Sequence, residues 1–360
     1  MTSPSYPTSP EPQPCAIPPE PFLSHPDRTL AAWAHATLRK HVRATFKYES
    51  EVCRDRDPED LHKMRVGMRR LRSDRLAFDR VILWPSGIDD RTIAKLGRTL
   101  GGLRDLDVLL ACLREHYRPQ MLAVSPDPAK NQVELQQFDA AIAKLQRQRK
   151  PALRQVRHLF QTQSYRRVVR RLEQWVTKPR YQPLADQPVD LVIPDLILPA
   201  IATLLLHPAW NCDPDLTLLA ADDRTAVDRF FDQHGTQLHS LRKQAKRVRY
   251  LLETFADCYP APSTYHTSVE MVRQIQAVLG NFQDNCVLVE FAQAYLADRS
   301  GTITLPTFDQ ILAQQRQTLL SDWRSLRAQF LDAQQRDRLR RSVLTKIIRD
   351  SSPALLGEIV

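Results

Sequence analysis

The sequence contains one cationic motif twice, and this repeat limits the possible folds more than any other feature. Residues 61–72 and residues 238–249 both fit the pattern Leu-His-x-x-Arg-x-x-x-(Arg/Lys)-Arg-(Leu/Val)-Arg. The two histidines, His62 and His239, are separated by about half of the chain. Self-similarity of this kind is typical of a chain built from two related halves.

Each copy has the periodicity of a helix with one buried face. At about 100° per residue, the histidine and three cations of each copy fall within roughly a quarter of the helix circumference. These residues are His62, Arg65, Arg69 and Arg72 in the first copy and His239, Arg242, Lys246 and Arg249 in the second. An apolar stripe runs beside them, formed by Leu61, Met64, Met68 and Leu71 and by Leu238, Leu241, Ala245 and Val248. The cations border a buried face, so we expect them to line a site.

A second repeated segment follows each cationic motif. Residues 100–109 align with residues 279–288, and both begin with Leu-Gly, carry an aspartate four positions after the glycine and end in an apolar run. The two motifs recur in the same order at nearly one spacing, which chance similarity between arginine-rich helices would not preserve. The sequence therefore predicts an internal duplication.

The composition favours an all-α fold with an anionic partner. Only 9 of 360 residues are glycine, and the long stretches rich in Leu, Arg, Gln and Ala are typical of helices. The net charge of +10 indicates a polyanion or a membrane surface as the partner, with simple solubility as the alternative.

The sequence also predicts a cytoplasmic protein. Its six cysteines are far apart and form no Cys-x-x-Cys pair, which is typical of free thiols in a reducing compartment. The N-terminus lacks the pattern of a signal peptide. The most apolar run, residues 189–206, is interrupted by Asp190, Pro194, Asp195 and Pro199, so we expect no membrane span and no membrane partner.

Proline-rich segments divide the chain into five parts. We expect a disordered leader at residues 1–26, a first helical half at 27–176, a connection at 177–222, a second helical half at 223–335 and a basic tail at 336–360. The first cationic helix should begin after the N-cap Asp57 and end at residues 84–87, and the next should begin near Asp89. A long helical stretch should cover 129–175, with a break near 151 or 161–164. The remaining helices are expected at 200–207, 238–255, 269–296 and 308–333. The sequence leaves open whether the helix at 238–255 is continuous with one before His239.

The duplicated cationic helix, followed by Leu-Gly-x-x-x-Asp, resembles the CHAD family, the conserved histidine α-helical domain. The resemblance covers roughly residues 25–335. It implies two pseudo-symmetric four-helix-bundle halves that enclose a central basic cavity and bind inorganic polyphosphate. The implied binding residues are His62, Lys63, Arg65, Arg69, Arg70, Arg72 and Arg98 in the first half and His239, Arg242, Lys243, Lys246, Arg247 and Arg249 in the second.

Three departures separate the two copies of the second motif. Gln283, Asn285 and Cys286 stand where the first copy has Arg104, Leu106 and Asp107. We therefore expect the two halves to contribute unequally to the site.

The cationic rows suit polyphosphate, a flexible polymer that carries about one negative charge per phosphate unit. Cations at i, i+3 or i+4 and i+7 repeat about every 5 Å along a helix, and guanidinium groups bind phosphate oxygens in pairs. Two facing rows would form a groove whose affinity falls steeply as salt rises. His62 and His239 could add charge at mildly acidic pH or stay neutral as hydrogen-bond donors, and the sequence leaves both readings open.

The acids near the motifs have structural roles in this prediction. We expect Asp105, Asp107 and Asp284 to cap helices or to orient motif arginines, because a buried arginine row without nearby acids would repel itself. No phosphate-binding Gly-x-x-x-x-Gly-Lys loop and no His-Glu-x-x-His occurs in the chain. We therefore predict a non-enzymatic protein without catalytic residues, bound metal or cofactor.

Two other functions remain open at this stage. Nucleic acids are polyanions too, but aromatic residues make up only 7% of the chain and the motif helices offer few rings for base stacking, which makes nucleic acid an unlikely partner. A helical scaffold with internally paired arginines is the other alternative.

The expected location is the cytoplasm, and the protein could associate there with polyphosphate granules. The sequence predicts no oligomeric state.

Overall fold

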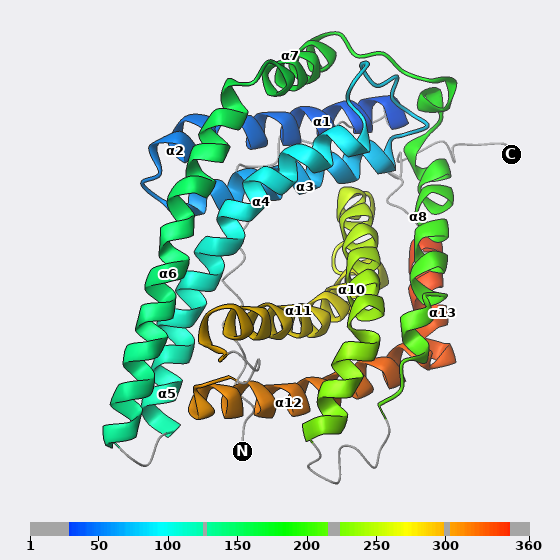
Figure 1. The fold of residues 1–360 in the computed structure, drawn as a ribbon. Helices are drawn as coiled ribbons and strands as arrows, with labels where there is room; N and C mark the ends of the chain where they lie inside the picture. The colour runs from blue at the N-terminus through cyan, green and yellow to red at the C-terminus, as the bar shows by residue number, and fades with distance from the viewer. Residues whose placement is uncertain (1–28, 125–127, 215–223, 299–302, 346–360) are drawn as a thin grey trace, which may run out of the picture.

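The structure is a computed structural model that describes residues 29–124, 128–214, 224–298 and 303–345. These residues are helical and contain no β-strand, which confirms the all-α class. In Figure 1 the helices follow one another around a ring, with α4 and α6 on one side, α1 and α3 on the next, α8 and α10 opposite, and α11 and α12 completing it. The predicted leader, residues 1–26, lies outside the described residues.

The N-terminal part of the ring is a series of packed helices. Its elements are α1 (Leu30–Phe46), α2 (Glu49–Arg54), α3 (Pro58–Ala77), α4 (Asp90–Cys112), the π-helix η1 (Leu113–Tyr117), α5 (Arg118–Val124), α6 (Pro128–Gln161) and α7 (Gln163–Thr177). Helix α3 packs between α1 and α4, and α4 packs on α6. The first cationic motif therefore lies on a helix held from two sides.

The C-terminal part places the second motif in a similar setting. It consists of η2 (Pro183–Asp186), α8 (Val189–Leu205), η3 (Pro208–Asn211), α10 (Arg224–Thr254), η4 (Ala256–Cys258), α11 (Thr264–Leu296), α12 (Pro306–Leu331) and α13 (Ala333–Leu344). Helix α10 packs between α8 and α11, and α11 packs on α12. The motif helix predicted at residues 238–255 is continuous with the helix before His239, a point that the sequence had left open.

Side-chain caps fix the beginnings of the first motif helices. Asp57 accepts a hydrogen bond from the backbone of Glu59, and Asp89 accepts one from Thr92, so both predicted starts are confirmed. The end of α3 comes earlier than predicted, at Ala77 and not near Trp84. The chain after Phe78 is tied to the segment before η2 instead, because the backbone of Leu83 donates to Arg180 and that of Gln182 donates to Val81.

Two helices differ from the expectation near the connection and the tail. A helix was expected only at residues 200–207, but α8 begins at Val189 despite Pro194 and Pro199, since its residues Ile193, Ile197 and Ile201 are buried. Residues 333–344, which span the predicted boundary between the second helical half and the tail, form α13, which packs on α8 and buries Leu339. The expected tail beyond residue 345 lies outside the described residues.

Among the described residues, one helical stretch is long and apolar enough to cross a membrane. It covers Val189–Asn211, and its most apolar 18 residues have a mean hydropathy of 2.1 and are 39% buried within the protein. A core helix passes the same test, so the observation is weak support for a membrane span.

Two separate hydrophobic clusters hold the two parts of the ring together. The larger one includes the contact of α3 and α10, where the rings of Phe78 and Phe255 meet edge to face at 5.9 Å. The smaller one joins the far ends of α4 and α6 to α11 and α12, where Phe138 packs against Phe291 and Phe308. Both clusters take side chains from each half of the chain.

Candidate anion-binding site

Five cations from three helices form what we call the central cationic cluster. They are Arg65 and Arg69 on α3, Arg104 on α4, and Arg242 and Lys246 on α10. Lys246 shows most clearly that the cluster joins the two motif helices. Burial and the positive charges of Arg242, Arg69 and Arg65 together lower the pKa of Lys246 to about 7, with burial as the largest cause. The motif helices α3 and α10 therefore direct cations toward one another.

The arginines of the cluster experience the same repulsion. The pKa of Arg242 is lowered by burial and by Arg69 of the other motif helix. The pKa of Arg65 is lowered by burial, and Arg69 and Arg104 add to this effect. Arginine remains charged after such shifts, so the cluster carries several cations at close range in a partly desolvated setting.

Several donors in this cluster have no acceptor. The buried Nε atoms of Arg69, Arg104 and Arg242 have no hydrogen-bond partner in the part of the chain that the structure describes, and neither does Nδ1 of His239. Unsatisfied buried donors are costly, and each gains from an oxygen acceptor. The arrangement is therefore suited to a ligand that carries several anionic oxygens.

The pKa values of both motif histidines are lowered. Burial lowers the pKa of His62, and Arg104 is the largest electrostatic contributor in the same direction. Burial likewise lowers the pKa of His239, followed by Lys243, while Gln283 acts in the opposite direction. Of the two readings that the sequence left open, the structure supports neutral hydrogen-bonding histidines.

Equivalent glycines lie beneath equivalent arginines. A Cβ atom added to Gly101 would lie 2.9 Å from Nη1 of Arg65, and one added to Gly280 would lie 3.7 Å from Nη2 of Arg242. Both glycines belong to the repeated Leu-Gly segment. The segment thus lets each motif arginine lie across the neighbouring helix, and the contact is closer in the first half.

The three predicted structural acids have different partners. Asp105 accepts a charged hydrogen bond from Arg65 at 2.9 Å, as expected for an acid that orients a motif arginine. Asp107 pairs instead with Arg149 at 2.6 Å, and Asp55 binds the same guanidinium. Burial raises the pKa of Asp284, whereas Arg242 and Lys246 oppose that rise, which places this carboxylate beside the second motif.

Three predicted binding residues lie beside the cluster but have protein partners. Arg72 forms a two-bond ion pair with Asp90, at 2.5 and 2.9 Å, and Arg247 also acts on this carboxylate. Arg249 is buried, lies over the Tyr250 ring at 4.8 Å and faces Glu253. Their charges are partly neutralised by these contacts.

Four further predicted residues are directed elsewhere or are exposed. Lys63 lies over the ring of Tyr48, and Arg70 lines a pocket on another side of α3. Arg98 and Lys243 are exposed, although Lys243 still acts on His239. Arg104, by contrast, belongs to the cluster and was not among the predicted binding residues. Its position beside Asp105 in the second motif was the available signal.

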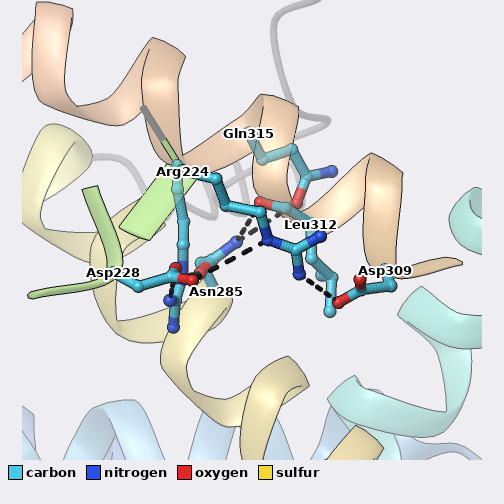
Figure 2. A network of polar contacts seen from close by, with 7 residues as sticks. Arg224, Asp228, Asn285, Asp309, Leu312 and Gln315 are labelled. Carbon is cyan, nitrogen blue, oxygen red and sulfur yellow. Dashed lines mark hydrogen bonds and ion pairs between the residues drawn. The ribbon is translucent and has the colours of Figure 1, made fainter. Parts of the chain in front are cut away.

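The departure of the second copy at Asn285 has a structural reason. Asn285 is buried in a polar network that joins α10, α11 and α12 (Figure 2). Its side chain accepts a hydrogen bond from Arg316 at 3.0 Å and donates to Leu312 and Gln315, while Arg316 also pairs with Asp228. The same Gln315 accepts from Tyr117 of η1, so the network also contacts the first half.

The described residues offer no arrangement of three or more His, Cys, Asp or Glu side chains that could hold a metal ion. Within the described ranges, Cys53, Cys112, Cys212 and Cys286 are free thiols. Neither His62 nor His239 therefore has the neighbours that a metal site requires.

Comparison with known proteins gives the family. The model of the CHAD domain matches residues 36–293. The chain belongs to the CHAD family. The match covers both cationic motifs and the segments that follow them, so the predicted family is confirmed.

Two solved structures share this CHAD fold. The crystal structure of the CHAD domain from the plant Ricinus communis is 23% identical, with a TM-score of 0.56, and the match covers 89% of this chain and 93% of that chain. PptA from Streptomyces chartreusis is 14% identical, with a TM-score of 0.50 and coverages of 88% and 100%. No curated protein matches the chain. At these identities the structural likeness establishes the fold alone.

Proposed function

We propose that this CHAD protein binds inorganic polyphosphate, without catalysing a reaction on it, at the central cationic cluster. The observation that carries the proposal is the meeting of Arg69 of α3 with Arg242 and Lys246 of α10. A repeated cationic helix in each half suits a ligand whose charges also repeat.

The energetics of the cluster favour such a ligand. Without an anion the five cations repel one another, and three arginine Nε donors lack acceptors in the described structure. Phosphate oxygens would relieve the repulsion and accept these hydrogen bonds together. A bare phosphate chain supplies oxygens at short intervals and needs no aromatic surface for bases.

The proposal includes three further elements. The halves arose by internal duplication, their helices enclose the cluster in a central basic cavity, and the protein works in the cytoplasm without a cofactor or a membrane partner. The equivalent placement of Gly101 under Arg65 and Gly280 under Arg242 supports the first of these.

A salt titration tests the function. We would measure the affinity for long-chain polyphosphate at several salt concentrations for the wild type and for a variant with Arg65, Arg69, Arg242 and Lys246 changed to alanine. The wild-type affinity should fall steeply with salt, and the variant should bind about a hundredfold more weakly or worse. A matched control replaces four exposed cations of α6 by alanine, namely Lys144, Arg147, Lys150 and Arg154. Equal losses in the two variants would contradict the site.

Nucleic acid is the second candidate, because it is also a polyanion. Competition separates the two ligands. Labelled polyphosphate should be displaced by unlabelled polyphosphate and much less by DNA or RNA at the same phosphate concentration. Equal displacement would favour the nucleic-acid reading.

A helical scaffold without a ligand is the third candidate, and the ion pairs Arg65–Asp105 and Arg72–Asp90 favour it. Reversal of the charges at Arg65, Arg69, Arg242 and Lys246 distinguishes it from a receptor. A receptor should lose anion affinity and keep its stability, since repulsion is relieved, whereas a scaffold should be destabilised.

A further inference from the structure

A separate polar pocket lies between α1, α3 and the C-terminal end of α10. It has a volume of about 170 Å³ and is lined by Trp33, His41, Asp74, Tyr250 and Glu253, among others. Asp74 follows Arg65 by nine positions, which places it about 180° around α3 from that arginine. The pocket is therefore distinct from the central cationic cluster.

The pocket contains a buried carboxylate that is only half satisfied. Asp74 is 0% exposed, and its Oδ2 atom bonds to Nδ1 of His41 at 2.7 Å. Its Oδ1 atom has no hydrogen-bond partner within the described residues. A buried carboxylate oxygen strongly favours a donor, above all a charged one.

The neighbouring polar groups also present acceptors to the pocket. Ser73 already donates its hydroxyl proton to the carbonyl of Arg69, and Thr254 donates its own to that of Tyr250. The indole N–H of Trp33 is bound to the carbonyl of Thr254. These groups can therefore offer a ligand only oxygen lone pairs and aromatic rings.

We propose that this pocket binds a small organic cation, with its ammonium group on Asp74. Asp74 and Asp257 line the pocket together with Glu253, which is already paired with Arg249 and Arg273, and the rings of Trp33 and Tyr250 can hold a cation against their faces. A metal ion is a poorer occupant, because the described residues form no metal-binding group of three or more His, Cys, Asp or Glu side chains.

Two exposed cations at the same pocket, Lys40 and Arg70, would oppose the ligand by charge. Their long side chains can extend into solvent, so they reduce the affinity but do not close the pocket. Arg70, the motif residue that is directed away from the central cluster, thus lines this second pocket.

Calorimetric titration of the full chain tests the proposal. The probe is n-butylammonium, with n-butanol as a neutral molecule of the same shape. We expect saturable binding of the ammonium compound only. Asp74→Asn should weaken that binding about tenfold or more, because it removes the charged acceptor. Glu173→Gln, which removes an exposed acid on α7, serves as the matched control and should leave the affinity unchanged.

Two further variants keep the proposal testable if Asp74→Asn does not fold. The exposed Asp257→Asn should weaken ammonium binding a few-fold, and Lys40→Met with Arg70→Met should strengthen it. Binding should persist in an Arg65→Ala and Arg242→Ala variant, which separates this site from the polyphosphate proposal. Equal binding of n-butanol, absence of saturable binding, or an ordered water as the sole occupant of Asp74 Oδ1 would overturn it.

Discussion

Arg65 donates to Asp105 at 2.9 Å, whereas Arg242, at the equivalent position of the second repeat, forms no ion pair within the described residues. The first motif arginine is therefore held by its acid, whereas Arg242 lies near the carboxylate of Asp284 without forming an ion pair with it. The two halves of the candidate site differ in how their acids engage the motif arginines, although their motifs match.

Replacement of Asp105 should strengthen anion binding. Asp105→Asn removes a negative charge next to Arg65, and because the carboxylate is largely exposed we expect polyphosphate affinity to rise only about two- to fivefold. Direct titration at one fixed salt concentration measures this. The control Asp107→Asn, which loses its bond to Arg149, should lower stability and leave affinity unchanged. Weaker binding by Asp105→Asn would show that the carboxylate positions Arg65 for the ligand.

Lys246 makes both stability and binding depend on pH. Its pKa is about 7 in the folded protein and 10.5 ordinarily, so the unfolded chain holds more protons between these values. Stability should therefore rise with pH across this window. A bound polyanion favours the protonated lysine, so polyphosphate affinity should fall as pH rises above about 7.

Lys246→Arg provides the test, because arginine stays charged throughout. The variant should bind polyphosphate with little change between pH 7 and about 9, while the wild type weakens. Calorimetry in buffers of different ionisation enthalpy should show proton uptake on binding for the wild type only. A wild type without pH dependence would contradict the assignment.

Helix packing at Gly67 should tolerate no side chain. A Cβ atom there would lie 2.9 Å from the backbone Cα of Thr45 on α1, which cannot move away easily. Gly67→Ala should therefore lower the free energy of unfolding by about 1–3 kcal/mol. Gly102→Ala, where nothing lies within 4 Å, should instead raise it by about 0.5–1 kcal/mol. Urea denaturation of both variants measures the contrast.

The network around Asn285 should contribute to stability and not to anion binding. Asn285→Leu introduces the residue of the first copy, but it leaves Arg316 without its amide acceptor (Figure 2). We expect a loss of about 1–3 kcal/mol in unfolding free energy. Polyphosphate affinity should stay the same, and a parallel loss of affinity would link this network to the site.

The helices were predictable where local signals are strong. Asp57 and Asp89 act as N-caps because their side chains satisfy free backbone N–H groups of the next turn. The early end of α3 was not predictable, since it depends on hydrogen bonds between residues near 82 and residues near 181. Only the part of helix α8 after residue 200 was predicted, and for a similar reason, because burial against α10 and α13 offsets its two internal prolines.

The candidate site was predictable in part. Helical periodicity alone placed Arg65 and Arg69 on one face, and the same periodicity separates Arg70 from Arg69 by about 100° and from Arg65 by about 140°. Sequence could not show that Arg72 is bound by Asp90, which belongs to another helix. Nor could it show that Lys246 lies near Arg65 and Arg69, because that proximity depends on how α3 and α10 cross.

The smaller hydrophobic cluster has a consequence for the independence of the two halves. Phe138 of α6 is covered by Phe291 and Phe308, so either half alone would expose the apolar surface that the other now covers. Fragments cut within residues 215–223 should each aggregate singly and recover solubility when mixed. In this respect the molecule resembles an obligate heterodimer whose subunits happen to share one polypeptide.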